Sequence, residues 1–290
     1  MTVDELRQVL GPIGIWMAPP AMTGIDPKKY GLQIEAAGFT SAWFGRVDSA
    51  ADLAAVEAML SSTQRLVLGT GIASVWAWAP GELAAEADRL AATYPGRFIL
   101  GLGVSHAPRV ESTGQDYVKP YTKMVQFLDE LPPTTAMIML AALGPKMIEL
   151  SRDRTLGAHP YFVPPEHTAF ARSVLGPEPL LIPELAVALA PGAEGAAAAR
   201  DYAQRYLRLP NYTNNLKKFG FSAEDIEGAG SDRLMSRVVP NGPEATVTRL
   251  REHLAAGADH VVVQPVTEDG KFDAAGLRGM EDLVADLKRP

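Results

Sequence analysis

The sequence contains no cysteine among its 290 residues. This absence excludes disulfide bonds, thiolate catalysis, and zinc or iron–sulfur sites with cysteine ligands. Histidine is scarce, with five residues, and no group of histidines and carboxylates has the spacing of a metal-binding motif. The G-x-S-x-G motif of serine hydrolases is also missing. Metal-dependent and acyl-enzyme chemistry therefore rank low among the possible functions.

The sequence also has fewer basic than acidic residues. Lysine and arginine total 27 against 34 aspartate and glutamate residues, a formal net charge of -7, which argues against a nucleic-acid-binding surface. No uncharged apolar run reaches the roughly 20 residues that span a bilayer. The first ten residues include Asp4, Glu5 and Arg7 and lack the apolar core of a signal peptide. We therefore expect a cytoplasmic protein that binds neither nucleic acid nor membrane.

The most informative stretch of the sequence is residues 97–106, RFILGLGVSH. Its apolar run is too short for a helix and lies between a Pro-Gly pair and a polar loop, which predicts a strand buried on both faces. Gly101 and Gly103 would let the backbone approach a flat ligand, and tight packing inside a sheet explains them equally well. Ser105 and His106 are the first polar residues beyond the strand.

Strand and helix signals alternate along the whole chain. Eight strand–helix units predict a parallel (β/α)8 TIM barrel, as a single domain over residues 1–290. Residues 191–242 interrupt the alternation after the seventh strand, and we predict an insertion there that serves as a lid or a subunit contact. A doubly wound sheet is disfavoured because Pro19-Pro20 stand where its glycine-rich phosphate turn would be. The expected strands are 13–18, 41–44, 66–75, 97–104, 136–142, 157–163, 180–189 and 260–266, and the expected helices outside the insertion are 27–38, 52–61, 80–92, 121–131, 146–154, 166–175, 243–256 and 274–287, with a polar loop at 108–119.

In such a barrel, chemistry takes place at the carboxyl ends of the strands. Leu143 and Gly144 precede Pro145 at the start of a predicted helix, where free amides and the positive end of the helix dipole bind phosphate. An ordinary turn with proline at the first helical position fits the same residues. His106, together with Ser105, would exchange a proton with a substrate near neutral pH, or it is a structural histidine.

Other polar and aromatic residues near strand ends have competing interpretations. His159, at the end of the sixth strand, would converge with His106 on one pocket, or it is a structural histidine. Arg46 would bring positive charge to an anionic ring or substrate, or it is a solvated loop residue. Glu184 must be paired or protonated, and a structural role inside the barrel is favoured. Trp76 and Trp78 would wall a planar ring, or they serve packing and dimer contacts.

Several longer motifs extend over nearly the whole chain, at residues 69–76, 94–98, 100–106, 142–146, 156–161, 206–212 and 256–261. Through these motifs the chain resembles the luciferase-like flavin and deazaflavin barrel superfamily. It is most similar to the actinobacterial branch of oxidoreductases that depend on the deazaflavin coenzyme F-420.

The resemblance implies a ring in the barrel mouth, against a bulge at the end of the third strand that contains a non-proline cis peptide, here Ser74-Val75. It also implies that His106 is the acid or base. Relatives often carry an acidic residue or a histidine after the second strand, where this chain has Gly45-Arg46, and Arg46 is the second catalytic candidate. The cofactor contacts implied are Ala73, Ser74, Val75, Gly103, Val104, Ser105, Ala142, Leu143, Gly144 and His159, with Leu143 and Gly144 on the phosphate.

The function implied is hydride transfer between coenzyme F-420 and a small organic substrate. One alternative is an FMN-dependent luciferase-like monooxygenase, because the two cofactors share a ring shape and a phosphate site. An alternative of another class is a non-catalytic protein that binds a deazaflavin or a flavin. The resemblance also implies a homodimer formed through early barrel helices, and the alanine-rich segments 52–61 and 82–92 would permit close helix packing.

Overall fold

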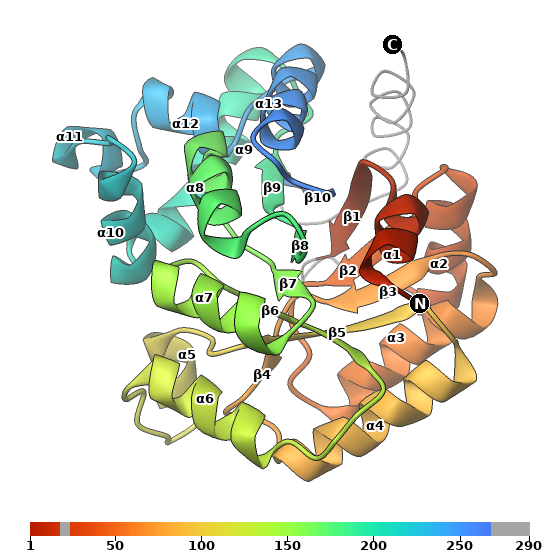
Figure 1. Cartoon of the computed structure of the whole chain (residues 1–290). Helices are drawn as coiled ribbons and strands as arrows, with labels where there is room; N and C mark the ends of the chain where they lie inside the picture. The colour runs from red at the N-terminus through yellow and green to blue at the C-terminus, as the bar shows by residue number, and fades with distance from the viewer. Residues whose placement is uncertain (18–23, 268–290) are drawn as a thin grey trace.

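The computed structural model describes residues 1–17 and 24–267 (Figure 1). Within these ranges strands alternate with helices, and all paired strands are parallel. The strands are β1 (Ile13–Met17), β2 (Ser41–Phe44), β3 (Val67–Thr70), β4 (Ala73–Ser74), β5 (Phe98–Gly103), β6 (Met137–Leu140), β7 (Gly157–Ala158), β8 (Leu180–Leu181), β9 (Glu184–Val187) and β10 (Val261–Pro265). The helices are α1 (Val3–Leu10), α2 (Pro27–Ala36), α3 (Ala50–Ser62), α4 (Pro80–Thr93), α5 (Ala107–Glu111), α6 (Pro120–Glu130), α7 (Pro145–Arg154), α8 (Pro165–Leu175), α9 (Gly192–Leu207), α10 (Pro210–Lys218), α11 (Ala223–Ile226), α12 (Asp232–Val238) and α13 (Pro243–Ala255).

The strands close into a barrel. Their order is β8-β7-β6-β5-β3-β2-β1-β10-β9, and β8 and β9, at the two ends of this order, are consecutive in the chain. The Ile182 N–H donates to the Ala158 carbonyl at 3.0 Å, and the Val262 N–H donates to the Pro183 carbonyl at 2.9 Å. Segment 180–187 therefore joins both edges. Because β3 and β4 both pair with β5, and β8 and β9 form one segment, the described strands fill the positions of a (β/α)8 barrel, as predicted.

Large side chains fill the interior of this barrel. Trp16 and Trp43 belong to an apolar cluster inside it that also contains Leu6 and Leu10 of α1. Thr2 is the N-cap residue of α1, and its hydroxyl forms a capping box with Glu5. Because α1 runs directly into β1, its buried leucines close the amino-terminal end of the barrel and leave the carboxyl ends of the strands for function.

The insertion forms a helical unit, α9 to α12, that is attached to the barrel at both of its ends. The Ala188 N–H donates to the Pro240 carbonyl at 3.0 Å, and the Gly242 N–H donates to the Ala188 carbonyl at 2.8 Å. Its own apolar cluster includes Tyr202 and Leu216 and extends to Phe162 of the barrel. Figure 1 shows these helices grouped on the side of the barrel that carries α8, and the Arg237–Glu166 ion pair joins α12 to α8. The insertion therefore leaves and re-enters the barrel at one place.

Several elements differ in extent from the predicted ones. The third strand is broken into β3 and β4, and at the break Gly71 leaves room for Trp16, whose ring would lie 2.1 Å from a Cβ at that position. The sixth strand is reduced to β7, and the first residues of the predicted loop 108–119 are helical because they belong to α5. The sequence did not predict α1, α10 or α12. The predicted helix at 274–287 and the end of the first strand at Ala18 lie outside the described residues.

The predicted cis peptide at Ser74-Val75 is wrong, because no cis peptide bond occurs among the described residues. The Val75 N–H donates to the Gly103 carbonyl at 3.0 Å, and the Ala77 N–H donates to the Ser74 carbonyl at 2.9 Å. The chain thus leaves β4 in an ordinary hydrogen-bonded turn, while Val75 extends the pairing with β5.

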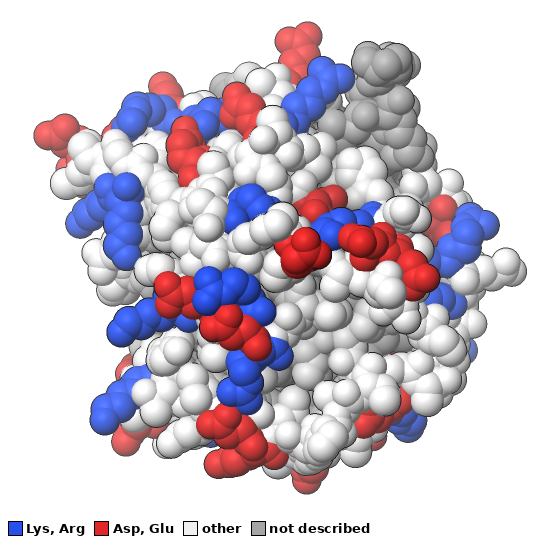
Figure 2. Space-filling model, viewed as in Figure 1, with Lys and Arg blue, Asp and Glu red and all other residues white. Residues whose placement is uncertain are grey.

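Charges of both signs are mixed on the face shown in Figure 2, without a large field of one sign. No helix in the described part of the chain is long and apolar enough to cross a membrane. The predicted homodimer stays a prediction.

Candidate functional site

A cavity of about 530 Å³ lies at the carboxyl ends of the strands. It is bordered by the segments that follow β3, β5, β6 and β7, and by α10 of the insertion. Its walls are largely apolar and aromatic, with polar groups from several elements. The lining residues are Ile72, Val104, Ser105, His106, Tyr117, Pro120, Tyr121, Ala141, Ala142, Leu143, Gly144, Pro145, Lys146, Met147, His159, Tyr161, Asn211, Tyr212, Asn214, Asn215 and Lys218. The structure therefore brings together seven of the predicted site residues: Val104, Ser105, His106, Ala142, Leu143, Gly144 and His159.

The backbone turns sharply where β5 enters this cavity. Ser105 has a φ of 55°, a left-handed conformation that is uncommon for a residue other than glycine and is often found at functional sites. Two side chains fix the turn: the Trp76 indole donates to the Val104 carbonyl at 2.9 Å, and the Tyr117 hydroxyl donates to the Ser105 carbonyl at 3.3 Å. The next residue, His106, is thereby placed at the cavity wall.

His106 is mostly enclosed by protein. The Tyr212 hydroxyl lies 3.5 Å from its Nε2, and the two rings have centroids 5.4 Å apart. Burial lowers the pKa of His106 below its ordinary value of 6.5, because the cationic imidazolium is less well solvated there than in water. The imidazole is therefore neutral at pH 7 and has a lone pair that accepts a proton.

A second wall of the cavity is the amino-terminal end of α7. Gly144 is the N-cap residue of this helix, and its carbonyl accepts from Met147 and Ile148 at 3.1 Å. The N–H groups of Leu143 and Gly144 lie before the first hydrogen bond of the helix, and they have no acceptor within the described ranges. A Cβ on Gly144 would meet nothing within 4 Å. Unpaired amides at the positive end of a helix dipole, next to open space, suit an anion.

Helix α10 adds polar groups that the sequence did not single out. Asn215 is buried and lines the cavity, and its Nδ2 has no hydrogen-bond partner among the described residues. Such a donor costs free energy when it is left unpaired, so an acceptor in the cavity would satisfy it. Lys218, from α10, and Lys146, from α7, also border the cavity. The only signal in the sequence was the asparagine inside 206–212 and the two that follow it, Asn214 and Asn215.

His159 forms part of the cavity floor. It is buried between Trp16 and Trp43, with ring centroids 5.2 and 5.1 Å away and interplanar angles of 17° and 8°. Its Nδ1 faces the Ile182 carbonyl, and its Nε2 has no partner among the described residues. Burial lowers the pKa of His159 to about 4. His159 is therefore a neutral, stacked group with one buried ring nitrogen that has no partner among the described residues.

A buried hydroxyl network connects the floor to the insertion. The Tyr161 hydroxyl lies 2.6 Å from that of Tyr202 and 2.7 Å from that of Tyr206, and it donates to Gln264 at 2.9 Å. Tyr202 lies 3.5 Å from the carboxyl group of Glu184. Burial raises the pKa of Glu184 to about 8, so this carboxyl is largely protonated at pH 7. This arrangement agrees with the structural role favoured for Glu184.

Five predicted site residues do not border the cavity. Ala73, Ser74 and Val75 are buried in the pairing between β4 and β5. A Cβ on Gly103 would lie 2.8 Å from Ile72, and one on Gly101 would lie 1.8 Å from the Thr70 carbonyl, so close packing explains both glycines. The side chain of Arg46 is 40% exposed and pairs with Asp48 at 3.2 Å.

The two tryptophans expected to wall a ring are also not among the residues that line the cavity. Besides its bond to Val104, Trp76 has its ring beside the Lys123 ammonium, 5.4 Å from the ring centroid. The Trp78 indole donates to the Val47 carbonyl at 3.0 Å. Tyrosines 117, 121, 161 and 212 occupy the wall instead.

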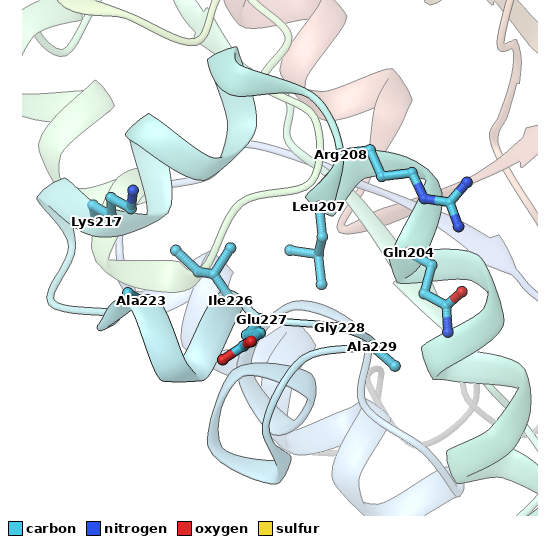
Figure 3. Close-up of a pocket in the computed structure, with 9 residues that line it drawn as sticks. All are labelled: Gln204, Leu207, Arg208, Lys217, Ala223, Ile226, Glu227, Gly228 and Ala229. Carbon is cyan, nitrogen blue, oxygen red and sulfur yellow. The ribbon is translucent and has the colours of Figure 1, made fainter.

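A second cavity, also of about 530 Å³, lies within the insertion (Figure 3). Figure 3 shows Leu207 and Ile226 pointing into the space between α9, α10 and α11, with Lys217 on the far side. None of the predicted site residues lines it. None of the residues that line this second cavity is among those with a buried, unpartnered side-chain polar atom within the described ranges. No group of three or more potential metal ligands occurs in the described part of the chain. The cavity at the strand ends is therefore the candidate site.

Comparisons with known proteins agree with this fold. Residues 26–137 match the family model of the luciferase-like monooxygenases, the superfamily that the sequence motifs resemble. No curated protein matches the chain significantly.

Solved structures match nearly the whole chain. An F420-dependent secondary alcohol dehydrogenase in complex with an F420-acetone adduct has 14% identity and a TM-score of 0.66, covering 96% of this chain and 99% of its own. The coenzyme F420-dependent tetrahydromethanopterin reductase of Methanopyrus kandleri has 16% identity and a TM-score of 0.70, with coverages of 94% and 96%. The FMN-bound oxygenating constituent of 3,6-diketocamphane monooxygenase from Pseudomonas putida has 11% identity and a TM-score of 0.68, with the same coverages. At these identities the similarity shows the fold.

Proposed function

We propose that this protein is an oxidoreductase dependent on coenzyme F-420. The proposal starts from its barrel fold and from the match of residues 26–137 to the family model of the luciferase-like monooxygenases. The protein transfers a hydride between the deazaflavin and a small organic substrate. The observation that carries the proposal is a single cavity that combines anion donors from α7 and α10 with the titratable imidazole of His106.

The residues present fit an anionic cofactor. The Leu143 and Gly144 amides and the unpaired Nδ2 of Asn215 are donors without acceptors among the described residues, and Lys146 and Lys218 supply positive charge at the same cavity. FMN ends at its phosphate, whereas F-420 carries carboxylates beyond it. The two lysines would pair with these carboxylates while the amides bind the phosphate, so the site favours F-420 over FMN.

The aromatic and apolar part of the cavity suits the ring of the cofactor. Ile72 and Val104 offer apolar surface, and the neutral His159 lies in the floor with one unpaired nitrogen. A bound deazaflavin would supply the hydride chemistry, and the protein supplies binding, orientation and exclusion of water. Tyr117 and Tyr212, rather than Trp76 and Trp78, border the space that the ligand would fill.

We assign the transfer of the substrate hydroxyl proton to His106. Its neutral imidazole accepts the proton of a substrate hydroxyl when the carbon that bears it becomes a carbonyl, and its protonated form returns the proton in the opposite direction. A pKa lowered by burial keeps the proton-accepting form available at pH 7. The resting state of the site therefore suits alcohol oxidation.

The test is equilibrium binding of F-420 and of FMN to the apo-protein, monitored by ligand fluorescence. Tighter binding of F-420 than of FMN supports the proposal, and preference for FMN would overturn the cofactor assignment in favour of a monooxygenase. Bound F-420 should then be reduced by a panel of small secondary alcohols. Tight binding without turnover of any alcohol, aldehyde or activated alkene would favour a non-catalytic binding protein.

A further inference from the structure

One buried histidine outside the cavity contacts the backbone of its anion-binding wall. His167, on α8, is 0% exposed, and its Nε2 lies 2.8 Å from the Leu143 carbonyl. A carbonyl oxygen only accepts hydrogen bonds, so Nε2 carries the proton and donates. Its Nδ1 has no partner among the described residues. This tautomer is the one that leaves His167 with a single directed bond, to Leu143.

That bond acts on the peptide unit that contains the Gly144 N–H. The Leu143 carbonyl and the Gly144 N–H belong to one planar group, and in a trans peptide they point in opposite directions. No cis peptide is present among the described residues. When His167 holds the carbonyl on the α8 side, the Gly144 N–H is directed to the opposite side. Gly144 borders the cavity, and the N–H has no acceptor within the described ranges.

We propose that His167 is a positioning residue, which orients the Leu143–Gly144 peptide so that the Gly144 N–H is presented to an anionic group of the bound cofactor. The inference rests on the proposed function. The unpaired Nδ2 of Asn215 at the same cavity independently indicates that an acceptor belongs there. Without the His167 bond the peptide would be free to rotate, and binding would have to bear the entropic cost of ordering it.

The imidazole of His167 is itself fixed by aromatic packing. The ring of Phe219 lies 5.2 Å away and that of Phe170 lies 6.1 Å away, both at an interplanar angle of 66°. Phe219 directly follows α10, the helix that supplies Asn215 and Lys218 to the cavity. The insertion therefore contributes to the anion site twice, through its own donors and through the packing that holds His167 in place.

His253 provides a matched control. It is also 0% exposed, its Nδ1 lies 2.8 Å from the Thr168 hydroxyl, and its Nε2 has no partner among the described residues. Unlike His167, it does not contact the backbone of the cavity. Replacing either histidine with phenylalanine removes one buried hydrogen bond and keeps a planar ring, so a general loss of stability should be similar in both variants.

The experiment measures binding of F-420, FMN and inorganic phosphate to apo forms of the wild type, H167F, H167Q and H253F, together with the amide ¹⁵N and ¹H shifts of Gly144. We expect H167F to raise the dissociation constant for F-420 about ten-fold, the size of one hydrogen bond to a charged group. H167Q, which retains an N–H donor near the position of Nε2, should bind nearly as the wild type does. H253F should lose thermal stability and keep its affinity.

Two results would overturn the inference: wild-type affinity in H167F, or an equal loss of affinity in H167F and H253F. Failure of the proposed function has a different signature, in which the wild type binds neither F-420 nor FMN. The Gly144 amide shifts then still decide the role of His167. A shift that changes in H167F and returns in H167Q supports the role, and one that is the same in all variants contradicts it.

Discussion

The Tyr212 hydroxyl lies 3.5 Å from Nε2 of His106, so a residue of the insertion contacts the histidine that follows β5. Tyr212 is buried within α10, and its ring packs edge-on against Tyr206 and Phe162. The tyrosine is therefore held by the aromatic cluster that joins the insertion to Phe162 of the barrel, and not by β5. This contact makes the environment of His106 dependent on how the insertion packs.

Replacing His106 with alanine should remove turnover and leave cofactor binding intact. The variant loses the group that accepts the substrate proton, and such groups contribute about 10²- to 10⁴-fold to rate. We expect kcat to fall within that range, whereas the dissociation constant of F-420 changes by less than about three-fold. Rapid-mixing measurement of F-420 reduction and fluorescence titration give the two quantities. Undiminished turnover would show that another group moves the proton.

The pH dependence of the wild type should follow the neutral form of His106. Burial lowers the pKa of this residue below 6.5, so kcat/KM for alcohol oxidation should reach its plateau at a lower pH than a histidine with the ordinary pKa of 6.5 would give. It should fall as the pH decreases through the pKa, because protonation removes the lone pair. In H106A, this decrease at low pH should be absent from the pH profile of the residual rate. A rate that instead falls as the pH rises through this range would identify His106 as a proton donor in the measured direction.

Consecutive lysines of α10 line different cavities, Lys217 the one within the insertion and Lys218 the one at the strand ends. K218A should therefore raise the dissociation constant of F-420 about three-fold at low ionic strength, a size typical of an exposed charge pair. The effect should vanish near 1 M salt, where the screening length is about 3 Å. K217A, with the same change in net charge, should bind as the wild type does. Equal effects of the two variants would indicate a long-range electrostatic effect instead of a contact.

The barrel was predictable because its signals are local and repeat. Each strand is a short apolar run bounded by turn residues. The barrel helices begin with a proline or, in the case of α3, after the capping residue Ser49. Leu143 and Gly144 were found in the same way, since a turn that opens a helix has a recognisable sequence and its amides are unpaired by geometry. These features depend on neighbours in the chain and not on distant contacts.

The remainder of the site depends on distant contacts, which a single sequence does not display. Asn215 lines the cavity only because the insertion folds back over the strand ends through its tyrosine cluster. His167 lies within an ordinary helical segment, and its role requires knowing that Leu143 is adjacent in space. The break at Gly71 depends on the position of Trp16, which lies 55 residues earlier in the chain.

Four of the five histidines should make the protein sensitive to acid. Burial lowers the pKa of His159, His167 and His260 to about 4 and that of His253 to about 3. Between pH 6.5 and 4 the unfolded chain binds protons that the folded chain does not, so the free energy of unfolding falls as the pH decreases. Each histidine contributes up to about 1.4 kcal/mol per pH unit. Urea unfolding at several pH values should show this slope, and H253Q should reduce it by about one histidine's share. An unchanged slope in H253Q would contradict the assignment.

Glu184 should have the opposite dependence on pH. Burial raises its pKa to about 8 from an ordinary value of 4.5, so the folded protein retains a proton that the unfolded chain releases. Its contribution to stability is fully present below pH 4.5 and is lost as the pH rises towards 8, by about 1.4 kcal/mol per pH unit. Glutamine has no proton to lose and can still face Tyr202 and the Phe162 N–H.

The E184Q variant should therefore gain stability relative to the wild type as the pH rises from 5 to 8, measured as the difference in the free energy of unfolding by urea. The buried histidines titrate alike in both proteins, so their effect cancels from this difference. E149Q, which changes an exposed glutamate of α7, serves as the control and should give a difference that does not vary with pH. If the difference for E184Q is also constant, Glu184 is ionised in the folded protein and the hydroxyl network around Tyr161 stabilises a carboxylate rather than a protonated acid.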